Sequence, residues 1–182
     1  MQKLLTSGPG SQLPKTFLYA NLGLYAAYTL SSGPLKLKYE KYLTMQSGSL
    51  PTALIFSHFC NTNPFATLFN CGVLGTIGMN IAQCHGASTF LKVVALSIGA
   101  STLLSLAQMR HDSSKSYAGG AGISAGLITY TAFANPQLLA IRGFPLPPTA
   151  YFAAALFYGL YSNNSAVIGG VGAGYAAFLL VL

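Results

Sequence analysis

The chain has 182 residues and a net charge of +7; 52% of its residues are hydrophobic and only 6% are charged. A soluble domain typically carries about 25% charged residues, so these few ionic side chains could not cover a water-facing surface. The composition therefore excludes a soluble enzyme, a disordered tail and a nucleic-acid module, and it predicts a protein that faces lipid. At about 20 residues per span, this length allows six or seven spans with little left for an extramembrane domain.

The basic excess indicates lipid rather than nucleic acid as a partner. The nine Lys and Arg residues are scattered between positions 3 and 142, without the clustering of a phosphate-tracking surface. They suit anionic lipid headgroups better. Possible metal ligands are few and spread along the chain: His58, His85, His111, Cys60, Cys71 and Cys84, with Glu40 and Asp112 as the two acids. We therefore expect neither a metal site nor a cofactor.

Apolar runs separated by Gly, Pro and polar clusters predict a single all-α transmembrane domain over residues 1–182, with six spans. After a short N-terminal segment, residues 1–15, the spans are expected at about 16–31, 64–82, 87–108, 119–134, 147–161 and 165–182. Spans of about 16 residues reach roughly 24 Å, which is short for a hydrocarbon core of about 30 Å. Either the bilayer is then locally thinner, or partner subunits cover the ends of these spans.

Residues 32–63 are expected to form a long interfacial loop after the first span. Lys36, Lys38 and Lys41 alternate there with leucines and tyrosines. This mixture is typical of the headgroup layer, where long cationic side chains snorkel and aromatic rings anchor. The spans leave four cations on one side of the membrane and five on the other, so charge does not predict the orientation.

Glycine recurs inside the second, fourth and sixth spans: Gly72, Gly75 and Gly78, then Gly119, Gly120, Gly122 and Gly126, then Gly169, Gly170, Gly172 and Gly174. Glycine every third or fourth residue leaves a shallow groove in which another helix backbone can lie. We expect these three spans to form the tightly packed centre, with Gly122, Gly126, Gly170 and Gly174 as helix-packing positions. The other three spans should face lipid or partner subunits.

Three fragments on those spans carry further information. Asn70 lies in FATLFN, Ser124 in GAGISAGLIT, and Gly170 and Gly174 in AVIGGVGAG. In this order and spacing the sequence resembles the rhomboid intramembrane serine proteases, most closely the mitochondrial, presenilin-associated rhomboid-like branch. The resemblance begins near Lys41 and continues to the C-terminus.

The resemblance implies a six-helix rhomboid-like bundle with a long interfacial loop after the first helix. It also assigns a nucleophile position to Ser124 and an oxyanion-site position to Asn70. The branch implies the mitochondrial inner membrane, with a plastid membrane as the alternative. The fragments KYLT (41–44) and FSHF (56–59) belong to the same resemblance.

The departures from the family pattern bear directly on activity. Val167 stands where the family has its general-base histidine, Ala66 where it has a second-helix histidine, and Ala125 where a glycine follows the serine. The chain also has no tryptophan, so the family's Trp-Arg loop motif is missing. A serine hydroxyl needs an adjacent base to take its proton, and an isopropyl group cannot do so.

We therefore interpret the family positions as vestigial. Ser124 is expected to bond back to a helix carbonyl, and Asn70 to make a hydrogen bond between the second and fourth spans. Val167 should fill the space of an imidazole with apolar volume, and His58 should be an interfacial loop residue.

The sequence thus predicts a catalytically inactive rhomboid-like protein that serves as a structural or accessory subunit. Its partners would be other integral membrane subunits and lipids, within a respiratory or ATP-synthase complex. Three alternatives stay open. The chain could capture transmembrane segments of clients without cutting them, be an active protease that uses Ser124 with an unconventional base, or be a small channel in which Lys92 is the candidate intramembrane charge.

Overall fold

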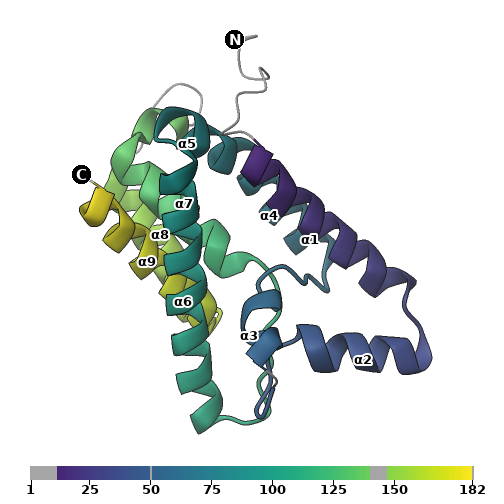
Figure 1. The fold of residues 1–182 in the computed structure, drawn as a ribbon. Helices are drawn as coiled ribbons and strands as arrows, with labels where there is room; N and C mark the ends of the chain where they lie inside the picture. Colours follow the sequence, from purple (N-terminus) through teal and green to yellow (C-terminus); the bar gives the residue numbers. More distant parts are fainter. Residues whose placement is uncertain (1–11, 50, 140–146, 182) are drawn as a thin grey trace.

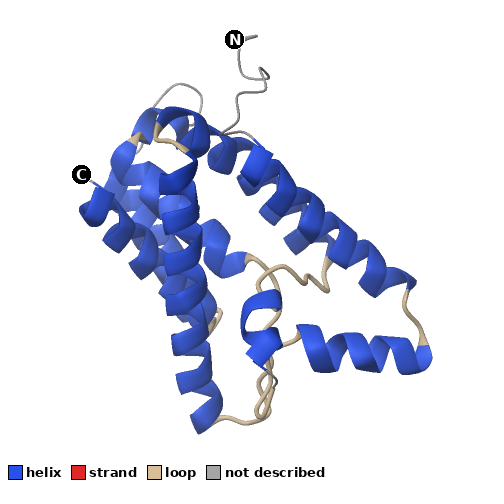
Figure 2. Cartoon of the chain, in the orientation of Figure 1, coloured by secondary structure: helices blue, strands red, loops and turns tan. Residues whose placement is uncertain are grey.

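The structure is a computed structural model that describes residues 12–49, 51–139 and 147–181. Its elements, in chain order, are α1 (Gln12–Leu30), α2 (Gly33–Leu43), α3 (Pro51–Phe56), α4 (Pro64–Val73), the π-helical turn η3 (Leu74–Gly78), α5 (Met79–Cys84), α6 (Ala87–His111), α7 (Ala121–Ala134), the 3₁₀ turn η4 (Pro136–Leu139), α8 (Pro148–Tyr161) and α9 (Ser165–Val181). Within the described ranges there is no strand, apart from one antiparallel bridge between Met45 and Tyr117 (Figure 2). The all-α prediction is confirmed.

Local sequence explains why several helices begin where the apolar runs do. Asn63 caps α4 by accepting a hydrogen bond from the Phe65 backbone N–H at 2.8 Å, and Pro64 occupies the first turn. Asn164 caps α9 in the same way, through the Ala166 N–H at 3.1 Å. Gly86 separates α5 from α6 with a φ of +89°, a conformation that glycine adopts without strain.

The predicted second span is one continuous helix from α4 through η3 to α5, and it contacts α1 along its length (Figure 1). The bundle around α9 consists of α6, α7 and α8. We predicted that the second, fourth and sixth spans form the packed centre. This is wrong for the second span, because α6, the predicted third span, packs against α9 in its place. The physical reason is a row of small side chains on α6: Ser97, Ser101 and Ser105 are fully buried at four-residue intervals.

The glycines of α7 and α9 let these two helices lie in backbone contact. A Cβ on Gly170 would collide with the carbonyl oxygen of Gly122, and one on Gly174 would collide with that of Gly126. On their other side, Gly122 and Gly126 lie against the hydroxyls of Ser101 and Ser97 on α6. The two GxxxG pairs and the serine row thus interlock three helices. Gly119 and Gly120, which we assigned to the fourth span, precede α7 instead.

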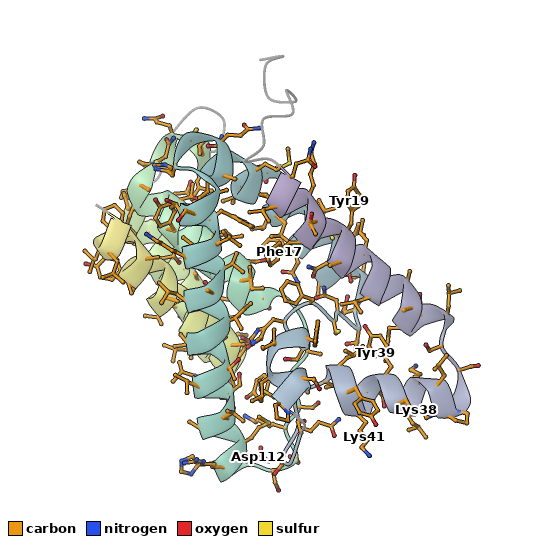
Figure 3. The ribbon with its side chains drawn as sticks, in the orientation of Figure 1. Phe17, Tyr19, Lys38, Tyr39, Lys41 and Asp112 are labelled. Atoms are coloured by element: carbon orange, nitrogen blue, oxygen red, sulfur yellow. The ribbon has the colours of Figure 1, made fainter. Side chains whose placement is uncertain are left out.

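The segment 32–63, predicted as a loop, contains two helices. Pro34 stands in the first turn of α2, and the Leu, Lys and Glu residues that follow favour a helix. Tyr39 attaches α2 to α1 by donating a hydrogen bond to the Leu24 carbonyl oxygen at 2.8 Å, and burial raises the pKa of its hydroxyl. Lys38 and Lys41 lie on the side of α2 away from Tyr39 (Figure 3).

Two helices among the described residues are long and apolar enough to cross a membrane, Pro64–Cys84 and Ala87–His111. Two shorter apolar helices, Ala121–Ala134 and Ser165–Leu180, accompany them. Large apolar side chains are exposed on the outer faces of several helices, among them Leu103, Phe65, Phe157 and Leu180. In contact with lipid these side chains carry no penalty, whereas in water they would.

Candidate functional site

Ser124 and Asn70 meet in the interior, where α7 crosses α4. The Ser124 hydroxyl donates a hydrogen bond to Oδ1 of Asn70 at 2.6 Å. Both residues are almost completely buried, with 1% and 2% of their surface exposed. The bond joins the second and fourth predicted spans, as we expected for Asn70. The expected bond from Ser124 to a helix carbonyl is wrong, because the side-chain amide lies within reach of the hydroxyl.

Asn70 continues this contact into a row of buried amides. Its Nδ2 donates to Oδ1 of Asn61 at 2.8 Å, and Asn61 Nδ2 donates to Oδ1 of Asn21 at 3.0 Å. Asn21, on α1, donates in turn to the Phe17 carbonyl oxygen at 2.9 Å. The row therefore links α7, α4, the loop before α4, and α1. We call Ser124, Asn70, Asn61 and Asn21 the polar row.

Two members of the polar row, Asn21 and Asn61, were not predicted from the sequence. Asn21 left a signal, because it is an amide within an otherwise apolar run and intramembrane amides usually bond across helices. Asn61 left none, since its loop position is typical of an exposed residue. The structure buries it beneath Gly120, whose backbone N–H also bonds to Asn61 Oδ1 at 3.3 Å. Gly119 cannot carry a side chain at this position, because a Cβ atom would lie 2.7 Å from Oδ1 of Asn61.

Val167 and Ala66, the two positions at which the resemblance places family histidines, are not part of this row. Val167 packs with Ala125 and Val171 in a small apolar cluster that also includes Phe152. Ala66 lies in the first turn of α4 and is exposed, one turn before the buried Asn70. The structure thus brings together Ser124 and Asn70 among the predicted site residues, and it leaves apolar side chains at the other two positions.

All three histidines lie within the described residues, and none is hydrogen-bonded to Ser124. His58 Nε2 bonds to Thr102 Oγ1 at 2.9 Å, and Thr102 donates to the Leu54 carbonyl oxygen. Burial lowers the pKa of His58 to about 4, so its ring is neutral at physiological pH. His58 lies in the turn after α3, within the segment 32–63, and only 3% of its surface is exposed, so its ring packs inside the protein. His85 packs edge-on against Tyr130.

In the described part of the chain, no group of three His, Cys, Asp or Glu side chains could hold a metal ion. Cys60 and Cys71 are buried and Cys84 is exposed, and all three are free thiols. Burial raises the pKa of the Cys60 thiol, which disfavours the reactive thiolate.

The geometry of the polar row limits what Ser124 can do. An amide oxygen accepts a hydrogen bond but is not a base at neutral pH, so Asn70 cannot withdraw the serine proton. One of the two N–H groups of Asn70 Nδ2, which would donate to a developing oxyanion, is already bonded to Asn61. The arrangement resembles an interhelical bonding network more than an activated nucleophile.

The comparison with known families agrees with the helical architecture. The family described as Rhomboid domain matches residues 50–182, which is most of the chain. The chain belongs to the rhomboid family. The match begins just before α3 and includes Asn61, Asn70, Ser124 and Val167. No curated protein matches the sequence.

Rhomboid proteins are integral membrane proteins, so the family and the two long apolar helices both assign this chain to a membrane. Within the matched region, the rhomboid chain keeps a serine and an asparagine in hydrogen-bond contact. Val167, where the resemblance places the family's general-base histidine, also lies within the matched region.

Proposed function

We propose that this rhomboid chain is a pseudoprotease that works as a structural subunit of a larger membrane assembly. The observation that carries the proposal is the hydrogen bond from Ser124 to the Asn70 amide, beside a family base position filled by Val167. Loss of the catalytic histidine from a soluble serine protease lowers turnover about 10⁶-fold. Among the residues that the structure describes, the proton of Ser124 therefore has no acceptor suited to catalysis.

The state of Asn70 supports the same proposal. Its Nδ2 donates to Asn61 inside the protein, and Ala66 offers no second donor beside it. Removal of one oxyanion donor costs about 10²–10³ in turnover. An intermediate formed on Ser124 would thus lack a base, and one of the two N–H donors of Asn70 would already be engaged.

Composition and surface support the role of a subunit. Most of the residues fall in the six predicted spans, and the described helices expose aromatic and aliphatic side chains that neighbouring subunits or lipids could cover. The resemblance to the mitochondrial branch leads us to propose the inner mitochondrial membrane. A respiratory or ATP-synthase complex is then the assembly that the chain would join.

Two measurements test the proposal. Wild-type protein and Ser124→Ala are treated with a fluorophosphonate probe, and we expect no labelling of either. Labelling of the wild type that is lost in Ser124→Ala would instead show an active serine protease. Membranes solubilised in mild detergent are then resolved by native gel electrophoresis. We expect co-migration with one large complex at fixed stoichiometry, whereas a free species near 19.0 kDa would contradict the subunit role.

One observation favours capture of client transmembrane segments as a second candidate. The outer face of α4 exposes Phe65, Leu68 and Phe69 at 80%, 66% and 57%. A client-binding protein would show several substoichiometric partners, which change with growth conditions. A subunit would show one constant set, so quantitative crosslinking from this face distinguishes the two.

A further inference from the structure

A tight turn lies between α2 and α3 and joins two surface hollows. Residues 46–49 line a hollow of about 370 Å³ together with Leu37, Glu40 and Lys41. The same four residues line a second hollow of about 270 Å³, with Leu54, Leu106, Met109 and Arg110. One cation from α2 and one from the end of α6 therefore border the same turn.

The turn is built so that backbone donors stay free. The Ser49 N–H bonds to the Gln46 carbonyl oxygen at 3.0 Å, and the Gln46 N–H bonds to the Ser49 hydroxyl at 2.5 Å. Gly48 has a φ of +78°. The N–H groups of Ser47 and Gly48 have no acceptor within the part of the chain that the structure describes. Adjacent free N–H groups in such a turn form a concave site for an anion.

The charges around the turn favour an anion as well. Lys41 and Arg110 line the hollows, and neither makes an ion pair with a described residue. Glu40 lines the first hollow beside Lys41 and offsets part of its charge. Asp112, two residues beyond Arg110, accepts hydrogen bonds from the Ser114 hydroxyl and N–H, which lower the pKa of its carboxyl. Arg110 can thus present its guanidinium fork to a phosphate.

An apolar wall continues from the second hollow along α6. Leu54, Leu106 and Met109 line the hollow itself. Leu103, one turn before Leu106 on the same face as Arg110, is 69% exposed. A free phosphate would leave this wall uncovered, whereas the acyl chains of a lipid would lie along it.

We propose that the turn 46–49, Lys41 and Arg110 bind the phosphate of an anionic phospholipid, whose acyl chains pack along Leu106 and Leu103. The site lies at the C-terminal end of α6, where a spanning helix reaches the headgroup layer. The two cations and the backbone N–H groups of the turn hold the phosphate of the lipid, and apolar side chains of α6 contact its acyl chains. This proposal depends on membrane insertion and not on whether Ser124 is catalytic.

The test uses the full chain in mild detergent, titrated with dioctanoyl phosphatidylglycerol and followed by native mass spectrometry. Dioctanoyl phosphatidylcholine and inorganic phosphate are titrated in parallel. Arg110→Gln and Lys41→Gln each remove one lining cation. Lys38→Gln is the matched control, because Lys38 lies on α2 like Lys41 but lines neither hollow. Melting temperatures of all variants report whether they fold.

We expect phosphatidylglycerol to bind more tightly than phosphatidylcholine, with about fivefold weaker binding in each of the two lining variants. Lys38→Gln should change binding less than twofold. Equal binding of the two lipids, or an equal effect of Lys38→Gln, would overturn the site. Inorganic phosphate that competes at the concentration of the lipid would show a free phosphate as the occupant and overturn the lipid assignment. If Arg110→Gln fails to fold, Lys41→Gln still decides.

Discussion

The Asn61 side chain donates a hydrogen bond from Nδ2 to Oδ1 of Asn21, 40 residues earlier in the chain, at 3.0 Å. Through its own Oδ1 it accepts from Asn70, so a loop residue connects the first helix to the centre of the bundle. Figure 1 shows why this matters: α1 leans away from α6 along much of its length. The polar row therefore adds to the contacts that α1 makes with α4, η3 and α5 and to the packing of Phe17 against Phe59 and Phe90.

Replacement of Asn61 should therefore destabilise the protein more than its loop position suggests. Asn61→Ala leaves Nδ2 of Asn70 and Oδ1 of Asn21 without partners, and each buried unpaired group costs about 1–3 kcal/mol. We expect the free energy of unfolding to fall by about 3 kcal/mol in a detergent-denaturation titration. Thr62→Ala, at the exposed neighbouring position, should stay within about 0.5 kcal/mol of the wild type. Equal effects of the two variants would show that the polar row contributes nothing to stability.

Ser124 and Asn70 should be coupled in stability. Ser124→Ala leaves the Asn70 oxygen unpaired, and we expect a loss of about 1–2 kcal/mol. In a double-mutant cycle with Asn70→Ala, the two losses should be non-additive by about 1 kcal/mol, because they share one hydrogen bond. Unfolding of the four proteins under the same conditions supplies the measurement. Additive losses would mean that the 2.6 Å contact is not a stabilising bond.

Two glycines of α9 make a matched pair for testing the contact with α7. Gly170→Ala places a methyl group against the Gly122 carbonyl, and backbone displacement of this kind costs about 1–3 kcal/mol. Gly172→Ala enters open space and improves helix propensity, so it should leave stability unchanged or raise it by up to about 1 kcal/mol. Thermal unfolding in detergent compares the two. A Gly172→Ala protein as unstable as Gly170→Ala would rule out close packing as the cause.

Stability should also depend on His58 between pH 6.5 and 4. Burial lowers the pKa of His58 to about 4 in the folded protein, whereas the unfolded chain protonates near 6.5. The unfolded state then binds the proton first as the pH falls, so stability present above pH 6.5 is lost progressively toward pH 4. The full difference amounts to roughly 3 kcal/mol.

His58→Gln is the control for this pH dependence. It removes the titrating ring, so the melting temperature of the variant should fall less than that of the wild type between pH 7 and pH 5. A wild-type melting temperature that is constant over this range would contradict the low pKa and the burial behind it.

Several elements could be predicted from the sequence because their signals are local. The starts at Pro64, Ala87 and Ser165 follow from a cap, a helix-breaking glycine and a second cap, each within a few residues of the helix. The all-α class follows from composition and from the length of the apolar runs. The six-span count stays a prediction, since two of the described helices meet the length and hydropathy of a span.

The candidate site was partly accessible from the sequence. Ser124, Asn70 and Val167 could be singled out because the resemblance places them at motif positions. Asn61 and the serine row on α6 could not, because a polar residue in a loop or in a span has the same identity whether it faces solvent, lipid or another helix. His58 shows the same ambiguity, since nothing near it in the chain indicates that Thr102 would be its partner.

The sequence by itself determined that this chain is helical and apolar, with glycines repeated at the spacing of close helix packing. These properties reside in single residues or in short periodic patterns. The tertiary structure decided that α6 rather than α4 completes the central packing, and that a loop amide joins α1 to α7. Such choices depend on which surfaces come within a few ångströms of one another although they are 40 or more residues apart in the chain. Contacts of this kind leave no signal in the local composition.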